Sequence, residues 1–261
     1  MPNITVGEFH IEYEQRGAGR DLVLLPTLLA EMSVYDAVID ALAAKRRVTR
    51  LNFPGFGGSA GPIGDTVEDY ADLIAETIQA LGLPAEADLI GNGFGGFIAG
   101  TLAIRHGHLI DKLVLVDTGP GFPDPAKEPL RILAQKSSTE GMGAVLEAAI
   151  LRMFPEEFIA AAPEIIATRK QRLSAADPLL FANAALALTL LDNRPKLGEI
   201  KNQTLVVVGL ADKTTPPDLS RELHAGITGS QLIELTGIGH CPQLQDPAGF
   251  LAAIGPFLEI D

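Results

Sequence analysis

Residues 89–97 read LIGNGFGGF, an aliphatic segment that runs directly into a glycine-rich turn. Gly91, Gly93 and Gly95 occupy the frame of GxSxG, a motif that joins a strand to a helix through a sharp turn. Small residues are needed there because strand and helix cross closely, and the residue at the tip is normally held at positive φ. The motif places a serine at this tip, whereas Gly93 has no side chain. Alone, the stretch is equally a tight strand-to-helix turn or part of a nucleotide-binding fingerprint.

Short aliphatic runs alternate with helical patterns on both sides of this turn. The runs have the continuous apolar character of strands buried on both faces, and they cover residues 21–25, 47–52, 87–91, 112–117, 204–209 and 230–235. Apolar residues recur at a spacing of three and four, as in helices, over residues 33–44, 65–81 and 95–106. Asp65 is expected to cap the second of these helices and Gly82 to end it. The alternation predicts an α/β fold with a mostly parallel sheet covered on both faces, preceded by an edge hairpin around Gly7.

The regular alternation stops at GPGFPDP, residues 119–125. From there to about Gly198 the pattern is helical, rich in Ala and Leu, and contains no strand-like run. A chain of 261 residues suits one α/β domain with an insertion. We therefore expect a core made of residues 1–121 and 199–261, with a helical lid at residues 122–198.

Composition and charge argue against several kinds of partner. The chain has 20 Lys and Arg against 33 Asp and Glu, a net charge of −13, which disfavours nucleic acids and anionic membrane surfaces. Its single cysteine excludes an intrachain disulfide and suits a reducing compartment. The N-terminal residues have no signal-peptide pattern, and the longest apolar stretch is too short to span a bilayer. We expect a cytoplasmic protein with a small-molecule substrate; whether it forms a homo-oligomer stays open.

Two polar residues follow the last two predicted strands. Asp212 lies three residues after the strand at 204–209, and His240 lies in the segment GIGHCPQLQDP after the final strand. The order of turn, acid and histidine is that of the α/β-hydrolase triad, and the chain resembles this family over nearly its whole length. The segment LNFPGFGGS (51–59) matches the family loop DxPGxGxS, and Tyr35 stands where an aromatic residue commonly opens the first helix. Within the family, the chain is most similar to lid-bearing esterases and to enol-lactone or carbon–carbon bond hydrolases.

The resemblance implies a site built around His240. It implies that His240 transfers protons and that Asp212 orients the His240 ring. The alternative for His240 is a buried histidine that caps a loop, and the alternative for Asp212 is an aspartate that caps the helix near Pro217. In the family, two backbone amides form the oxyanion hole, and they correspond here to those of Leu28 and Phe94.

The chain departs from the family at the nucleophile. Where GNSxGG is common, this chain has GNGFGG, so Gly93 offers no hydroxyl for an acyl-enzyme, and we expect no neighbouring residue to replace it. The usual HG pair after the first core strand is Pro26 and Thr27, and Asn52 replaces a usual aspartate. Plant hydroxynitrile lyases, which are similar in fold, carry a threonine at the place of Thr27, where it contacts the substrate. The resemblance therefore implies that Thr27 binds substrate.

Three functional interpretations stay open. In the first, the protein is an enzyme that acts on a small, largely apolar ester, lactone or ketone. His240, held by Asp212, would act as a base on the substrate or on a water molecule, and no acyl-enzyme would form. The reaction would be hydrolysis, or the chemistry of a lyase or isomerase. The second is a catalytically silent ligand-binding protein, and the third an ordinary esterase or lactonase inactivated by a serine-to-glycine change. No metal or organic cofactor is implied, because no cluster of His, Cys and carboxylates has ligand spacing. Cys241 is expected to be a small buried apolar residue and Asn92 to be structural.

Overall fold

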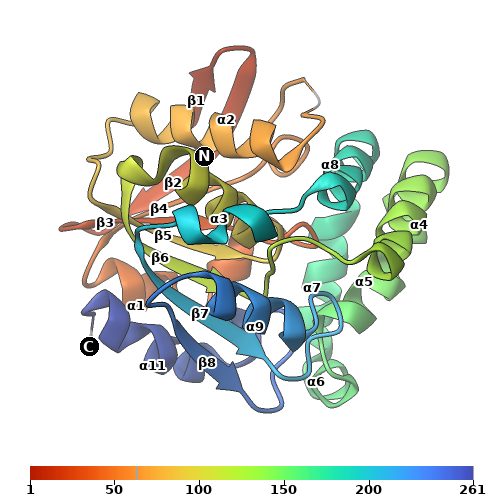
Figure 1. Ribbon diagram of the computed structural model, residues 1–261. Coiled ribbons are helices and arrows are strands. Elements are labelled where there is room, and N and C mark those ends of the chain that lie inside the picture. Colours follow the sequence, from red (N-terminus) through yellow and green to blue (C-terminus); the bar gives the residue numbers. More distant parts are fainter. Residues whose placement is uncertain (63, 261) are drawn as a thin grey trace.

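A sheet of eight strands forms the centre of the protein, whose computed structural model describes residues 1–62 and 64–260 (Figure 1). The strand order is β1-β2-β4-β3-β5-β6-β7-β8. The strands from β4 to β8 in this order run parallel, whereas β2 pairs antiparallel with both of its neighbours, β1 and β4. The strand bounds are β1 Asn3–Val6, β2 Phe9–Arg16, β3 Asp21–Leu25, β4 Arg47–Leu51, β5 Ala87–Asn92, β6 Ile110–Val116, β7 Gln203–Gly209 and β8 Gln231–Leu235.

The strands lie where the apolar runs predicted them, with ends that differ by one or two residues. All residues of β3 and β5 are buried, because helices cover both faces of the sheet at its centre. The predicted edge hairpin is confirmed: β1 and β2 pair around Gly7, which has φ +57°. The predicted core range ends at Asp261, which lies outside the described residues.

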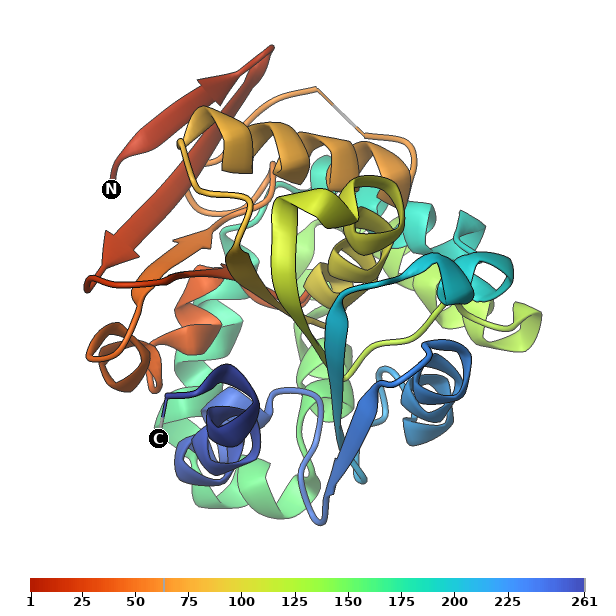
Figure 2. The ribbon, with the colours of Figure 1, turned by 60° about the vertical axis from the view of Figure 1, so that its left-hand side comes forward.

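Helices cover both faces of the sheet. Figures 1 and 2 show α1 (Ile39–Ala43) and α11 (Pro247–Leu258) on one face, and α2 (Val67–Ala80), α3 (Phe94–His106) and α9 (Pro217–Gly226) on the other. The mostly parallel, doubly covered sheet predicted from the sequence is therefore confirmed.

The single helix predicted for residues 33–44 was wrong in extent. The structure has a 3₁₀ helix at Met32–Tyr35, followed by the short α1. The side chain of Asn52 accepts a hydrogen bond from the Met32 amide (2.7 Å), and Arg50 donates one to the Met32 carbonyl (3.1 Å). The Asp36 amide donates to the Ser33 carbonyl and the Val38 amide to the Tyr35 carbonyl (both 3.0 Å), which are the bonds of a tighter 3₁₀ turn, and regular α-helix begins only at Ile39.

The predicted start of α2 was wrong by one residue. Thr66, not Asp65, is the N-cap: its hydroxyl accepts from the Asp69 amide (3.2 Å), and the Asp69 carboxylate accepts from the Thr66 amide (2.9 Å). This reciprocal pair is a capping box, which satisfies two otherwise unpaired donors. The helix ends as predicted, because Gly82 takes the left-handed conformation (φ +65°) that follows a helix C-terminus.

A group of helices is inserted between β6 and β7, in the strandless stretch that the sequence predicted. We call α4 (Asp124–Glu140), α5 (Leu146–Met153), α6 (Glu156–Ala161), α7 (Pro163–Ser174) and α8 (Pro178–Leu190) the inserted helices. Figure 1 shows them together beyond the carboxyl ends of the parallel strands, where α4 packs along α8. Within the described residues, no helix alone has the length and apolar character of a membrane span; only the pair α7 and α8, bent by 98°, meets that test jointly.

Candidate functional site

Gly93 stands at the sharp turn between β5 and α3. Its φ of 54° and ψ of −117° confirm the predicted positive φ. A Cβ on Gly91 would lie 2.6 Å from the carbonyl carbon of Gly95, and one on Gly95 would lie 2.6 Å from the Pro26 carbonyl oxygen. Strand, helix and the neighbouring turn therefore approach so closely that these two positions admit only glycine.

Asp212 and His240 meet at the carboxyl ends of β7 and β8, the neighbouring strands that precede them. The imidazole Nδ1 lies 2.9 Å from Asp212 Oδ2, and both side chains are buried. Oδ1 accepts from the amides of Thr214 (2.7 Å) and Thr215 (3.2 Å), and the Thr215 hydroxyl donates to Oδ2 (2.6 Å). The alternative that Asp212 caps the following helix is wrong, because α9 has no side-chain cap.

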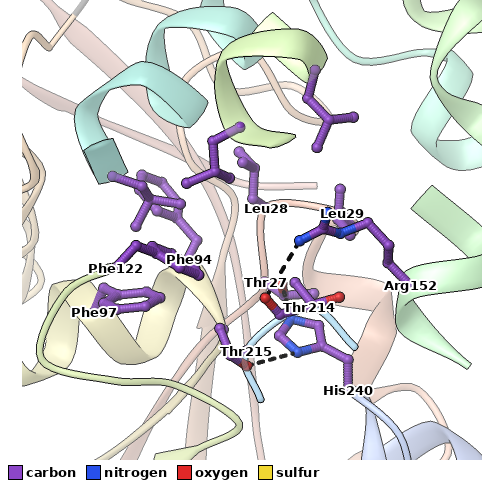
Figure 3. A pocket seen from close by; sticks show the side chains of 14 residues that line it. Thr27, Leu28, Leu29, Phe94, Phe97, Phe122, Arg152, Thr214, Thr215 and His240 are labelled. Carbon is purple, nitrogen blue, oxygen red and sulfur yellow. Dashed lines mark hydrogen bonds between the residues drawn. The ribbon is translucent and has the colours of Figure 1, made fainter. Parts of the chain in front are cut away.

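Thr27 supplies the second partner of the histidine ring. Its hydroxyl lies 2.9 Å from Nε2 of His240, and Figure 3 shows the imidazole between Thr27 and Thr215. The expectation that no neighbouring residue replaces the missing serine as nucleophile stays a prediction, and the turn after β3 brings the Thr27 hydroxyl close to the elbow. A continuous buried chain therefore runs from Asp212 through His240 to Thr27.

The two backbone amides assigned to an oxyanion hole belong to the residues that directly follow Thr27 and Gly93 in the chain. Leu28 follows Thr27, and Phe94 follows Gly93 as the first residue of α3. Among the described residues neither amide donates to any partner, and both residues line the cavity at His240. Since buried amides are nearly always paired, two free ones beside one cavity suit an oxygen acceptor that binds between them.

A small cavity opens beside these groups (Figure 3). Its free volume is about 20 Å³, which is enough for roughly one water molecule. Its apolar walls come from the core and from α4 and α8, and they comprise Leu28, Leu29, Phe94, Phe97, Phe122, Leu130, Leu133 and Leu188. In this structure the free space therefore lies between the core and the inserted helices α4 and α8.

The sequence analysis missed Thr215, described above, and two further polar residues of the cavity wall. Arg152 lies on α5, inside an ordinary amphipathic pattern, so the sequence carried no signal for it. Thr214 follows Asp212 closely, and a search of the loop that carries the acid would have found it. Figure 3 shows both near Thr27 and His240.

Asp117, which directly follows β6, is another residue near the site that the sequence analysis missed. It is fully buried and has φ 46°, a left-handed conformation that is uncommon outside glycine. Its Oδ1 accepts from the Gly209 amide (2.8 Å). Burial raises the pKa of Asp117 well above its ordinary value, and the negative charge of Asp212 raises it further. Asp117 therefore favours the neutral acid beside Asp212.

The remaining polar candidates have structural surroundings. The Asn92 amide donates to the His240 carbonyl (2.9 Å) and accepts from Gln243 (3.0 Å), so it ties β5 to the histidine loop. Cys241 is completely buried, and burial raises the pKa of its thiol, so it stays protonated. Asn52 joins the Met32 amide to Glu12. Within residues 1–62 and 64–260, no group of three or more His, Cys, Asp or Glu side chains is arranged to hold a metal ion.

Known proteins resemble the chain along nearly its full length. The model of the alpha/beta hydrolase family matches residues 22–253. The chain is 29% identical to a pimeloyl-(acyl-carrier protein) methyl ester esterase of Aeromonas hydrophila, over 95% of this chain and 99% of that protein. The enol-lactonase of Burkholderia xenovorans superposes with a TM-score of 0.94 at 27% identity, covering 99% and 100% of the two chains. A malate-bound thermophilic esterase of Thermogutta terrifontis gives 0.91 at 28% identity, covering 99% and 98%.

Proposed function

Because the chain belongs to the alpha/beta hydrolase family, we propose that it is an enzyme that hydrolyses a small, largely apolar ester or lactone, with His240 as general base. The observation that carries this proposal is the buried pair of Asp212 and His240, joined at 2.9 Å, beside two unpaired amides. Similarity to an esterase and to an enol-lactonase supports this reaction type.

The chemistry follows from the positions of these groups. Nε2 of His240 takes a proton from a water molecule, whose oxygen attacks the substrate carbonyl carbon. The carbonyl oxygen becomes an oxyanion held by the amides of Leu28 and Phe94. When the tetrahedral intermediate collapses, His240 returns the proton to the leaving oxygen, while Asp212 stabilises the charged imidazole. Gly93 takes no covalent part, so no acyl-enzyme forms at the elbow.

Thr27 and the inserted helices complete this proposal. The Thr27 hydroxyl holds Nε2 from the side of the cavity and binds the attacking water or the substrate oxygen when either arrives. The helices α4 and α8 form a lid over the site, because Leu130, Leu133 and Leu188 close the cavity above His240. Substrate binding therefore requires a lid movement, as in many enzymes with a covered site.

A second candidate is a lyase or isomerase, in which His240 moves a proton of the substrate itself. The contact between the Thr27 hydroxyl and His240 favours it, since this hydroxyl can hold a substrate oxygen beside the base. Hydrolysis in ¹⁸O-labelled water distinguishes the two reactions, because only hydrolysis places solvent oxygen in the product acid. Saturable binding without turnover, unaffected by His240→Ala, would instead indicate a ligand-binding protein.

The test is turnover of a panel of p-nitrophenyl esters and small lactones by three variants. His240→Ala should lower kcat/KM by about 10² to 10⁴, the usual contribution of a general acid–base group. His224→Ala, an exposed histidine on α9, is the matched control and should leave turnover unchanged. Asp212→Asn should lower kcat/KM without loss of fold by circular dichroism. Equal turnover in His240→Ala and the wild type would remove His240 from the mechanism.

A further inference from the structure

Arg152 is distinguished from the other arginines by the absence of a counter-ion. Every other arginine lies within ion-pair distance of a carboxylate, whereas Arg152 has none among the described residues. The contrast is clearest with Arg169, which is buried in the same group of helices but lies 3.7 Å from Glu31. Partial burial lowers the pKa of the Arg152 guanidinium, and the charge of Asp212, which lies beyond ion-pair distance, offsets this only in part.

The position of Arg152 is tied to the candidate site. The next residue, Met153, accepts a hydrogen bond through its carbonyl from the His240 amide (2.8 Å). Met153 and Phe154 are completely or nearly completely buried, which fixes the end of α5 against the histidine loop. The backbone next to Arg152 is therefore fixed against the histidine loop, and the Arg152 side chain lines the cavity at His240.

Two donors at this place lack acceptors. Nε of Arg152 and the hydroxyl of Thr214 are buried and have no hydrogen-bond partner among the described residues. The one contact of Arg152 is long, 3.5 Å from Nη2 to the Thr214 carbonyl. Both residues line the cavity at His240, and Figure 3 shows them on the same side of the imidazole, opposite the phenylalanine rings. One wall of a largely apolar cavity therefore presents a cation and a free hydroxyl.

We propose that Arg152 and Thr214 bind a carboxylate of the substrate, so that the substrate carries a free carboxylate in addition to its ester or lactone group. This inference rests on the proposed function and names its substrate class. A guanidinium matches the planar carboxylate through parallel N–H donors. One cation and one hydroxyl suit a monoanion, whereas the charge of −13 and the nearby Asp212 disfavour a more highly charged group such as phosphate.

The test compares two esters that differ only at the distal end, monomethyl glutarate and methyl pentanoate. The measured quantity is the ratio of their kcat/KM values, carboxylate over neutral. Arg152→Met should lower this ratio roughly 10- to 100-fold, mainly through KM, because it removes a charge-assisted hydrogen bond. Thr214→Val should lower the ratio by a smaller factor, and Arg152→Lys should recover part of it. Arg131→Met, which removes an exposed arginine of α4, is the control and should keep the wild-type ratio.

An unchanged ratio in Arg152→Met would overturn the inference. Glutarate binding, measured by calorimetry, separates this inference from the proposed function. If the wild type hydrolyses neither ester but binds glutarate at least about tenfold more tightly than Arg152→Met does, the carboxylate site stands and the proposed hydrolysis fails. Equal glutarate binding by both proteins, or binding of inorganic phosphate in preference to glutarate, would refute the carboxylate site. Circular dichroism of each variant establishes that the fold is retained.

Discussion

The hydroxyl of Thr27 lies 2.9 Å from Nε2 of His240, and a Cβ on Gly93 would collide with both groups. The hydroxyl that contacts Nε2 thus comes from the turn after β3 and not from the elbow. Threonine at position 27 and glycine at position 93 are therefore coupled: a side chain at the elbow requires Thr27 or the imidazole to move.

Replacing Thr27 tests the role of its hydroxyl. Thr27→Val keeps the shape of the side chain but removes the bond to His240, so kcat/KM should fall roughly 10- to 100-fold. Thr27→Ser retains the hydroxyl, so its kcat/KM should stay close to that of the wild type. Rapid-quench mass spectrometry should find no acyl group on the protein during turnover. An acylated Thr27 would contradict the non-covalent route and identify Thr27 as the nucleophile.

Introducing serine at the elbow tests the coupling of the two positions. Gly93→Ser alone should give little fluorophosphonate labelling, because its Cβ would lie 2.5 Å from Nε2 and would also meet Thr27. The double variant Gly93→Ser with Thr27→Gly should label and release p-nitrophenol in a burst. Both Gly93→Ser and Gly93→Ala, the control without a hydroxyl, should lose about 1 to 3 kcal/mol of unfolding free energy at this positive φ. Equal bursts in single and double variants would show that Thr27 does not obstruct the serine.

The buried acid Asp117 predicts a dependence of stability on pH. Its raised pKa means that the folded protein retains this proton while the unfolded chain releases it above about pH 4. The contribution of Asp117 to the free energy of unfolding is therefore fully present below about pH 4 and is lost as the pH rises through the pKa of the folded state. Asp117→Asn cannot ionise, so its melting temperature should improve relative to the wild type between pH 4 and pH 8.

The control for this comparison is Asp40→Asn, an exposed aspartate of α1, whose melting temperature should follow that of the wild type across the same pH range. A constant difference between Asp117→Asn and the wild type at all pH values would contradict the prediction. It would indicate that the backbone conformation of residue 117, and not its ionisation, determines the effect.

Enlarging the cavity from the side of the inserted helices tests the limit on substrate size. Leu188 of α8 is buried and lines the cavity, so Leu188→Ala should raise the ratio of kcat/KM for p-nitrophenyl octanoate over acetate. The same change should reduce the unfolding free energy by about 2 to 5 kcal/mol. Leu173→Ala removes an equally buried leucine of α7 that does not line the cavity, and should lose stability without changing the ratio. A parallel change of the ratio in both variants would assign the effect to loosened packing.

Several features followed from the sequence alone because their signals are local. Continuous apolar runs identified the strands of the sheet, since strands buried on both faces need no polar side. Glycine spacing identified the elbow, because only glycine allows β5 and α3 to approach so closely. The loops after β7 and β8 placed Asp212 and His240 at one edge of the sheet, since the carboxyl ends of parallel strands share an edge.

Other features were decided only by the tertiary structure. The contact between Thr27 and His240 joins residues far apart in the chain, and it depends on how closely the turn after β3 approaches the elbow. Arg152, which has no ion-pair partner among the described residues, lines the cavity at the end of α5, where the Met153 carbonyl binds the His240 amide, a contact that no periodic pattern encodes. The α-helix expected at residues 33–44 begins only at Ile39, after a 3₁₀ helix whose first residue, Met32, is bonded to Asn52 and Arg50. In each case the outcome depends on which side chains meet when separate elements pack, and local propensity does not determine that.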